Sequence, residues 1–200
     1  ELPEREHSVP VLSLDKCYSA EDMLGWIKRT QDKFPSQIEL SIEPKIDGSG
    51  VVLYYDNGEL QYALTRGNGY IGNDITANVK TIRNIPLKIS YTGKVAVRGE
   101  IYITTKDFEE YNKNYGDNRY ANPRNLASGC SRRLKSSEVA ECPLRIFVYE
   151  CFPENQIFSS HLENMIFMKE NGLPVNSYFG FFTSQNINEE LRDKINRAFP

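Results

Sequence analysis

The first clear pattern along the chain is a set of apolar positions at helical spacing near the N-terminus. These positions are Met23, Leu24, Ile27 and Phe34. Ser19 stands three residues before Asp22, as in a capping box, and Pro35 follows the last apolar position. The spacing therefore predicts one amphipathic helix that begins at Ser19 and ends at about Phe34.

Short apolar runs, alternating with polar residues or rich in β-branched residues, predict the strands. These runs cover residues 38–42, 51–55, 60–65, 94–103, 144–151 and 175–182. Asp56-Asn57-Gly58 separates the second run from the third and is typical of a tight hairpin turn. We therefore expect the strands on either side of this turn to pair in antiparallel orientation.

Capping residues, prolines and glycines mark the boundaries of further helices. The predicted helices run from Asn73 or Asp74 to about 82, from 104 or 105 to about 115, from 122 to about 134, from 159 or 160 to 172, and from 187 to 199. Hairpin strands mixed with separate helices are typical of the α+β class. We predict mixed, largely antiparallel sheets with flanking helices.

The composition is that of an ordinary soluble globular chain, because 40% of the 200 residues are hydrophobic and 26% are charged. No apolar run approaches the roughly 18 residues of a membrane span, and the charged N-terminus lacks the apolar core of a signal peptide. These features predict a cytoplasmic protein without membrane contact. The net charge is −3, so any contact with nucleic acid must come from a local basic patch.

The four cysteines, Cys17, Cys130, Cys142 and Cys151, form no C-x-x-C pair and have no histidine at metal-binding spacing. This pattern predicts no zinc site in the chain. In a cytosolic protein, scattered cysteines are expected to be reduced and to contribute to the packing of the core.

The segment Glu43-Pro44-Lys45-Ile46-Asp47-Gly48 contains Lys-x-Asp-Gly, the nucleophile motif of enzymes that attach a nucleoside monophosphate to a lysine. A lysine attacks an α-phosphate only as the neutral amine, so burial or cationic neighbours must favour loss of its proton. The lysine closes a predicted strand, and a glycine lets the chain turn away, which would hold the amine at the edge of a pocket. If the match to this short motif arose by chance, Lys45 would be an ordinary solvated surface lysine.

A glycine-rich block follows the hairpin. Arg66 precedes Gly67-x-Gly69-x-x-Gly72, an arrangement that would bring a guanidinium and amide N–H groups to a ribose or phosphate. The same glycines match a dinucleotide-binding fingerprint. However, the preceding strand is the second arm of a hairpin, and no acidic residue lies about 20 residues beyond Gly72. A plain glycine-rich turn would explain the spacing equally well.

Two further features carry charge. Glu100 lies within the β-branched strand Val97-Arg98-Gly99-Glu100-Ile101, where a glutamate either faces solvent or has a function. Between Lys113 and Lys135, six basic residues stand against one acidic residue. This basic island is the footprint expected for a phosphate-backbone site, or else for a solvated helix face.

In this order, these segments resemble the adenylation (nucleotidyltransferase) domain of bacterial NAD-dependent DNA ligases. The resemblance runs from about His7 to Val175, and its most specific parts are Thr65 to Pro86 and Ala121-Asn122-Pro123-Arg124-Asn125. It implies the nucleotidyltransferase fold of DNA ligases and capping enzymes. A helical lead-in over residues 1–36 would precede a nucleotide-binding core over residues 37–200.

The resemblance implies a role for each matched residue. Lys45 would be the nucleophile that becomes AMP-lysine, and Asp47 would orient it. Ser13 and Leu14 would line the adenine side of the pocket, and Glu43 would read the adenine amino group.

Four other residues would hold the rest of the substrates. Arg66 would contact the ribose or phosphate, and Glu100 would hold the ribose or assist a magnesium ion. Arg124 and Arg132 would grip the nicked DNA backbone or the phosphate of the bound nucleotide.

The implied enzyme is an NAD-dependent DNA ligase of DNA replication and of the repair of DNA damage, acting as a monomer on nicked double-stranded DNA. Lys45 would attack the adenylate phosphorus of NAD and release nicotinamide mononucleotide. AMP would then activate the 5′-phosphate of the nick, with Mg²⁺ stabilising the developing charge. The later lysine motif of the family, D-G-x-V-x-K, is not found before Pro200. The resemblance therefore implies a fragment with weak self-adenylation.

Two readings of other classes stay open at this point. One is a non-catalytic DNA-binding module that uses the basic segment 113–135, for which binding would depend steeply on salt. The other is a nicotinamide dehydrogenase built on Gly67 to Gly72, which an antiparallel hairpin before Gly67 would exclude.

Overall fold

The computed structural model of the chain describes residues 1–114, 120–175 and 180–183. The described residues group into two compact units. We call residues 1–12 and 45–175 the larger unit, and residues 13–44 and 180–183 the smaller unit. The units divide the chain at other points than residue 36, and the predicted division into lead-in and core stays a prediction. In the described part of the chain, no helix has the length and apolar character needed to cross a membrane.

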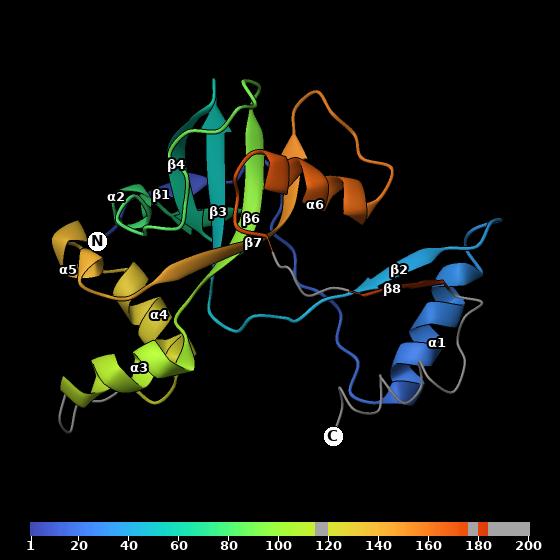
Figure 1. The fold of residues 1–200 in the computed structure, drawn as a ribbon, viewed down its shortest axis with the longest axis horizontal. Coiled ribbons are helices and arrows are strands. Elements are labelled where there is room, and N and C mark those ends of the chain that lie inside the picture. Colours follow the sequence, from blue (N-terminus) through green and yellow to red (C-terminus); the bar gives the residue numbers. More distant parts are fainter. Residues whose placement is uncertain (115–119, 176–179, 184–200) are drawn as a thin grey trace. The chain divides into compact units, whose positions relative to one another are not determined.

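A four-stranded antiparallel sheet forms the centre of the larger unit, in the order β4-β3-β6-β7 (Figure 1). Its strands are β3 (Ser49–Asp56), β4 (Glu59–Thr65), β6 (Val95–Tyr102) and β7 (Arg145–Pro153). Each strand begins and ends within two residues of a predicted run. The antiparallel pairing predicted from the sequence is therefore confirmed.

The predicted hairpin turn joins β3 to β4. Asp56 pairs with Glu59, and the two residues between them have positive φ angles, 51° at Asn57 and 74° at Gly58. Positive φ at both central positions defines the turn that matches the twist of hairpin strands, and it favours Asn-Gly. The hairpin also excludes the dehydrogenase reading, because a dinucleotide-binding unit needs parallel strands around its glycine turn.

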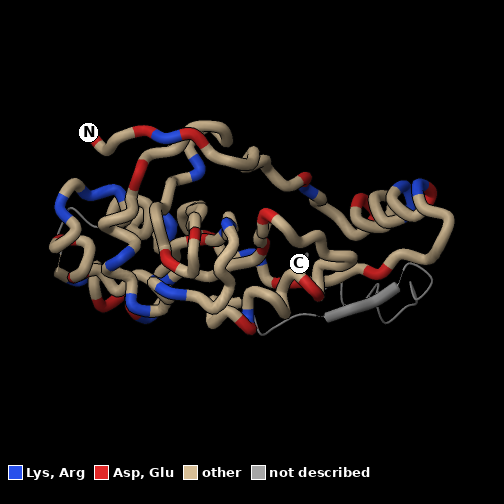
Figure 2. Tube along the Cα trace, turned by 90° about the horizontal axis from the view of Figure 1, so that it is seen from above, with Lys and Arg blue, Asp and Glu red and all other residues tan. Residues whose placement is uncertain are grey.

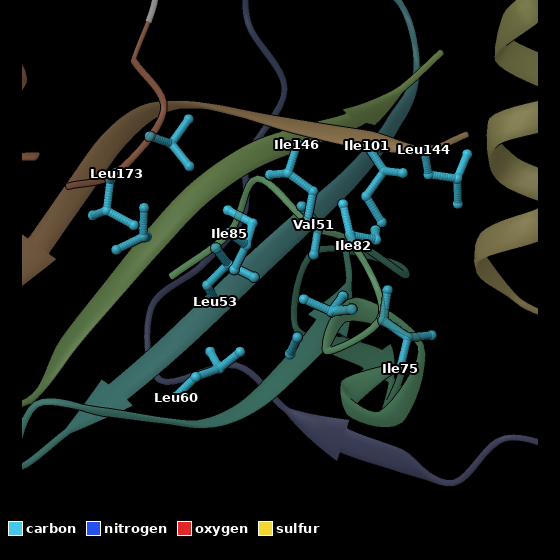
Figure 3. Close-up of a cluster of buried hydrophobic side chains, with 14 of the residues drawn as sticks. Val51, Leu53, Leu60, Ile75, Ile82, Ile85, Ile101, Leu144, Ile146 and Leu173 are labelled. Atoms are coloured by element: carbon cyan, nitrogen blue, oxygen red, sulfur yellow. The ribbon is translucent and has the colours of Figure 1, made fainter. Parts of the chain in front are cut away.

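One face of the sheet carries the main hydrophobic core. Buried side chains at alternate strand positions meet there, among them Val51, Leu53 and Ile101 (Figure 3). The helices that add buried side chains to this core are α2 (Thr76–Val79), α4 (Pro123–Ser131), α5 (Ser136–Ala140) and α6 (His161–Glu170). Since successive side chains of a strand point to opposite faces, the side chains of the intervening residues point to the second face of the sheet.

The N-terminal segment runs along the glycine-rich block and across the second face of the sheet. Strand β1 (Glu4–Glu6) pairs antiparallel with β5 (Ile71–Asn73). Farther along, Val11 N donates to Gly69 O at 2.8 Å, and the Val11 side chain is buried with Val52 and Tyr54. The sequence patterns predicted neither short strand, because three-residue strands of this composition carry no recognisable apolar period.

Helix α1 (Ala20–Gln31), in the smaller unit, begins as predicted. Asp22 N donates to Ser19 Oγ at 3.1 Å, and the Asp22 carboxylate accepts from Tyr18 N at 3.2 Å. The first bond satisfies a donor that the first helical turn would otherwise leave unpaired, and the second ties the residue before the cap to the helix. The helix ends three residues before the predicted Phe34. In the same unit, β2 (Glu39–Ile42) pairs antiparallel with β8 (Gly180–Thr183).

The other helices follow their predicted caps more closely than their predicted lengths. Side chains of Thr104, Asn122 and Ser160 cap α3 (Thr105–Asn112), α4 and α6. Helix α2 is shorter than predicted, and α5 was not predicted. The predicted helix over 187–199 lies outside the described residues, as does the predicted end of a helix near residue 115.

A buried amide ties helix α2 to the segment after α4. The Asn78 side chain is 3% exposed, and its Nδ2 donates to Ser131 O and to Arg133 O, both at 2.8 Å. Because Asn78→Ala leaves two carbonyl groups without these donors, we expect it to lower the free energy of unfolding by about 2 kcal/mol. Chemical denaturation followed by circular dichroism measures this. The exposed amide of Asn125, replaced by alanine, is the matched control, and an equal effect of both changes would contradict the prediction.

Candidate active site

The site is built where the first residues of β3 lie against the last residues of β6. Gly50 pairs with Glu100 across the two strands, and Arg66 N donates to Gly50 O at 3.2 Å. A Cβ atom on Gly50 would lie 3.4 Å from the Cβ of Arg66 and 3.8 Å from Oε2 of Glu100. Arg66 and Glu100 therefore both border Gly50, where a Cβ atom would make only ordinary van der Waals contacts.

Gly48 makes a closer approach to β6. A Cβ atom there would collide with the carbonyl oxygen of Ile101 and lie 3.1 Å from Cγ of Glu100. Its backbone N–H donates a hydrogen bond to the Glu100 carboxylate, an interaction that lowers the pKa of Glu100. The glycine of the Lys-x-Asp-Gly motif is thus required by the contact with β6.

Lys45 and Asp47 lie in the connection between β2 and β3, which has no regular secondary structure. The sequence interpretation placed Lys45 at the end of a strand, but β2 already ends at Ile42. Both side chains are exposed. Asp47 Oδ1 lies 3.4 Å from Nη1 of Arg124, which belongs to the first turn of α4. Exposed ion pairs of this kind are weak, so this pair leaves both groups available to a substrate.

Glu100 is the half-buried member of the group. Its burial raises the pKa above the ordinary value of 4.5, whereas the positive charges of Lys45 and Arg124 lower it. Of these two cations, Lys45 has the stronger effect on the pKa of Glu100. The structure therefore brings together Lys45, Asp47, Glu100 and Arg124, with Arg66 beside them.

The remaining predicted residues lie elsewhere. Arg132 is exposed at the C-terminal end of α4, beside Glu1, Glu4 and Leu134, and not in the group around Lys45. Ser13, Leu14 and Glu43 belong to the smaller unit, where Ser13 and Leu14 are exposed and Glu43 is half-buried. Their approach to Lys45 stays a prediction.

The glycine-rich block is held in one conformation by its neighbours. Gly67 and Gly69 have φ angles of 57° and 95°, and the Asn68 side chain accepts hydrogen bonds from Tyr70 N and Ile71 N, both at 2.9 Å. Nε2 of His7 lies 3.2 Å from the carbonyl oxygen of Arg66. These contacts fix the backbone from which the Arg66 side chain projects.

Sequence reasoning missed three polar residues on the same sheet face. Arg98 lies two residues before Glu100 in β6, and its Nη1 is 2.8 Å from Oε2 of Glu150 in β7. Tyr149 lies beside this pair, and burial raises its pKa. Alternation along β6 would have placed Arg98 on the face of Glu100, whereas nothing in the local pattern of β7 indicates which residues face it.

The described residues contain no group of three or more His, Cys, Asp or Glu side chains that could hold a metal ion. All four cysteines are free, and Cys130, Cys142 and Cys151 are buried, as expected for reduced core cysteines. The sequence interpretation named Glu100 as a possible ligand of Mg²⁺. This role of Glu100 stays a prediction.

An antiparallel α+β domain with a Lys-x-Asp-Gly lysine beside a half-buried glutamate is the class of domain that transfers nucleotides through lysine. Comparison with known proteins agrees. The family model for the NAD-dependent DNA ligase adenylation domain matches residues 1–198. The chain therefore belongs to this family, and the resemblance inferred from the sequence, together with its fold class, is confirmed.

Individual relatives are similar over nearly the whole chain. A DNA ligase of Borrelia turicatae is 44% identical over 194 residues, which are 96% of this chain and 28% of that protein. A DNA ligase of Borreliella afzelii is 43% identical over 195 residues, 98% of this chain and 29% of that protein. The chain thus spans less than a third of the length of the curated relatives it matches.

The contact between Gly48 and β6 yields a stability prediction. Gly48→Ala places a methyl group against Ile101 O, and we expect a loss of about 3 kcal/mol in the free energy of unfolding because backbone must shift. Asp47→Asn weakens only an exposed ion pair and should cost less than about 1 kcal/mol. Gly25→Ala, within helix α1, is the matched control and should be neutral or stabilising. Urea denaturation measures all three, and an unaffected Gly48→Ala protein would refute the close approach.

The raised pKa of Glu100 predicts a pH dependence of stability. Between pH 4.5 and the raised pKa, the folded protein holds a proton on Glu100 that the unfolded chain has released. Because the folded state holds this proton, the free energy of unfolding falls as pH rises through that window. Glu100→Gln should remove this pH dependence, so the stability of the variant relative to the wild type should increase with pH between 4.5 and 7. Denaturation midpoints at several pH values measure this, and parallel curves would contradict it.

Proposed function

We propose that the chain is the adenylation part of an NAD-dependent DNA ligase and that Lys45 is its nucleophile. The single observation that supports this most is geometric: the Lys-x-Asp-Gly segment packs against β6 at Gly48, beside the half-buried Glu100, and its Asp47 is paired with Arg124. Membership of the adenylation-domain family supports the proposed chemistry.

In the proposed first step, the Lys45 amine attacks the adenylate phosphorus of NAD. A P–N bond forms and the P–O bond to nicotinamide mononucleotide breaks, so that NAD is consumed and no hydride moves. The lysine must first lose its proton, since only the neutral amine carries the reacting electron pair. Negative charge develops on the phosphoryl oxygens, and the guanidinium groups of Arg66 and Arg124 are placed to stabilise it.

Glu100 would hold the ribose hydroxyls or contribute to a magnesium site. Mg²⁺ is usually bound by one or two carboxylates together with phosphate oxygens and water. A single glutamate beside the nucleotide phosphates would agree with this coordination. When bound, the ion would neutralise phosphate charge. Asp47, which is paired with Arg124, is the second carboxylate in reach of the group. Its proposed role is to orient Lys45 and its surroundings.

The smaller unit would supply the adenine contacts. We propose that Ser13 and Leu14 line the adenine and that Glu43, two residues before the nucleophile, accepts a hydrogen bond from the adenine amino group. A half-buried carboxylate suits this task, because a buried acceptor left without its donor is costly and therefore discriminates between bases.

Nicked double-stranded DNA would be the second substrate, to whose 5′-phosphate AMP is passed. Arg124 is placed to contact this phosphate or that of AMP, whereas Arg132 would contact the DNA backbone at a separate position. Figure 2 shows basic and acidic positions interleaved along the described chain. Arg124, which belongs to segment 113–135, is paired with Asp47 at the lysine site. A non-catalytic DNA-binding module based on this segment therefore has less support than the ligase function. A cytoplasmic location and a monomeric state belong to the same proposal.

The test is formation of a covalent AMP adduct. The longer ligase that contains this chain, incubated with NAD and Mg²⁺, should gain the mass of one adenylyl group, and Lys45→Ala should gain none. Intact-protein mass spectrometry and peptide mapping measure this. Lys80→Ala removes another exposed lysine of the larger unit and should leave the adduct unchanged. An adduct in Lys45→Ala at the wild-type level would refute the assignment.

The 200-residue chain by itself is expected to react weakly, because the resemblance places other lysines of the family outside it. Salt-dependent binding of duplex DNA by this chain, with no binding of adenine nucleotides, would instead support the non-catalytic DNA-binding module.

A further inference from the structure

Arg98 is a largely buried charged side chain near the site, and the proposed mechanism does not use it. It lies in β6, on the face opposite the main core, between Val52 of β3 and Glu150 of β7. Its side chain is 11% exposed, compared with 36% for Glu150. A guanidinium is seldom kept in such a place unless it is paired and has a task.

Three elements meet at this guanidinium. Nη1 donates to Oε2 of Glu150 at 2.8 Å, and Nη2 donates to the carbonyl oxygen of Leu12 at 2.9 Å. The guanidinium carbon lies 5.7 Å from the centre of the Tyr149 ring. Arg98 thus joins β6, β7 and the N-terminal segment through one planar group.

A bulge in β7 makes this arrangement possible. Arg98 pairs with Glu150, but the next residue, Gly99, pairs with Val148, so Tyr149 is the extra residue. Along β7, Ile146, Val148 and Cys151 are buried, while Tyr149 and Glu150 are both half-buried. The bulge therefore turns two consecutive side chains toward Arg98, which a regular strand does not allow.

The Leu12 contact lies where the N-terminal segment leaves the larger unit. Leu12 is the last residue of the N-terminal segment in the larger unit, and Ser13 and Leu14 follow it directly. Upstream, Val11 N is bonded to Gly69 O. Arg98 therefore holds the carbonyl of the residue from which the two proposed adenine contacts leave the larger unit, two residues along β6 from Glu100.

We propose that Arg98 is a positioning residue for nucleotide binding: by holding Leu12 O and Glu150 at once, it fixes the end of the N-terminal segment, from which the chain continues into Ser13 and Leu14, the proposed adenine contacts. This rests on the proposed function. Nε of Arg98 is buried and has no partner among the described residues. An unpaired buried donor opposes folding. We therefore attribute the arginine at this position to the contacts of Nη1 with Glu150 and of Nη2 with Leu12, and not to a gain in stability.

A lysine cannot replace this arginine in the proposed role. Its single ammonium group keeps the charge, and with it the attraction to Glu150, but it lacks the rigid fork whose two ends reach Glu150 and Leu12 in fixed directions. Arg98→Lys therefore separates charge from positioning. Arg98→Gln removes the charge as well. Arg145 provides the matched control, because its Nη2 lies 3.3 Å from Oδ2 of Asp107, away from Leu12, and the side chain is 52% exposed.

The experiment measures steady-state adenylation by the longer ligase at varied NAD concentration. For Arg98→Lys we expect KM for NAD to rise about tenfold with kcat within about threefold, because binding is lost while the reacting groups at Lys45 stay in place. Arg145→Lys should change neither constant by more than about twofold. Hydrogen exchange of the peptide over residues 8–14 should accelerate in both Arg98 variants and not in Arg145→Lys. Thermal melting confirms that each variant is folded.

Other outcomes overturn the inference. An unchanged KM in folded Arg98→Lys, or a fall in kcat at unchanged KM, shows that Arg98 does not act through nucleotide binding. Unchanged exchange at residues 8–14 shows that Leu12 is held by other contacts. If Arg98→Lys does not fold, Glu150→Gln keeps the arginine and weakens its pair, and it should raise KM about threefold by the same mechanism. An unchanged KM there also overturns the inference. A wild-type ligase that forms no AMP adduct refutes the proposed function instead.

Discussion

The close approach of Gly48 to β6 is the constraint on which the site depends. Because Gly48 has no Cβ atom, its backbone lies against Ile101 and its N–H reaches the Glu100 carboxylate. The same closeness helps to cover Glu100, while Lys45 stays exposed. A larger side chain at Gly48 would push this segment away from β6 and leave the Glu100 carboxylate in solvent.

The central sheet divides its two faces between stability and chemistry. One face is packed with apolar side chains and helices, and this is where burial stabilises the larger unit. The other face carries Arg98 and Glu100, with Tyr149 and Glu150 beside them, and the N-terminal segment crosses it near Val52 and Tyr54. Glu100, which is proposed to hold the ribose or a magnesium ion, therefore projects from the central sheet, while exposed pairs such as Asp47 and Arg124 can exchange their partners for a substrate.

Local signals in the sequence predicted most of the fold. The four strands of the central sheet, the Asn57-Gly58 turn and the cap at Ser19 depend on neighbouring residues, and the structure confirms them. For two further helices the cap was predicted as one of two adjacent residues, and the structure selects Thr104 and Ser160. The helix expected after Asn122-Pro123 is also present. The short strands β1 and β5 were missed because each exists only through the other. The end of α1 and the length of α2 were wrong because tertiary contacts decide where a helix stops.

By itself, the sequence determined the chemical groups and the family: a Lys-x-Asp-Gly lysine, a glycine-rich block and an Asn-Pro-Arg segment in a fixed order, matched over residues 1–198. Only the tertiary structure decided which of these groups meet. It placed Glu100 and Arg124 beside Lys45, left Arg132 at the far end of α4, and brought Arg98 against Glu150 through a bulge. The physical reason is that register and bulges join strand residues distant in sequence, and a one-residue slip of β6 or β7 would turn Arg98, Glu100 or Glu150 to the opposite face.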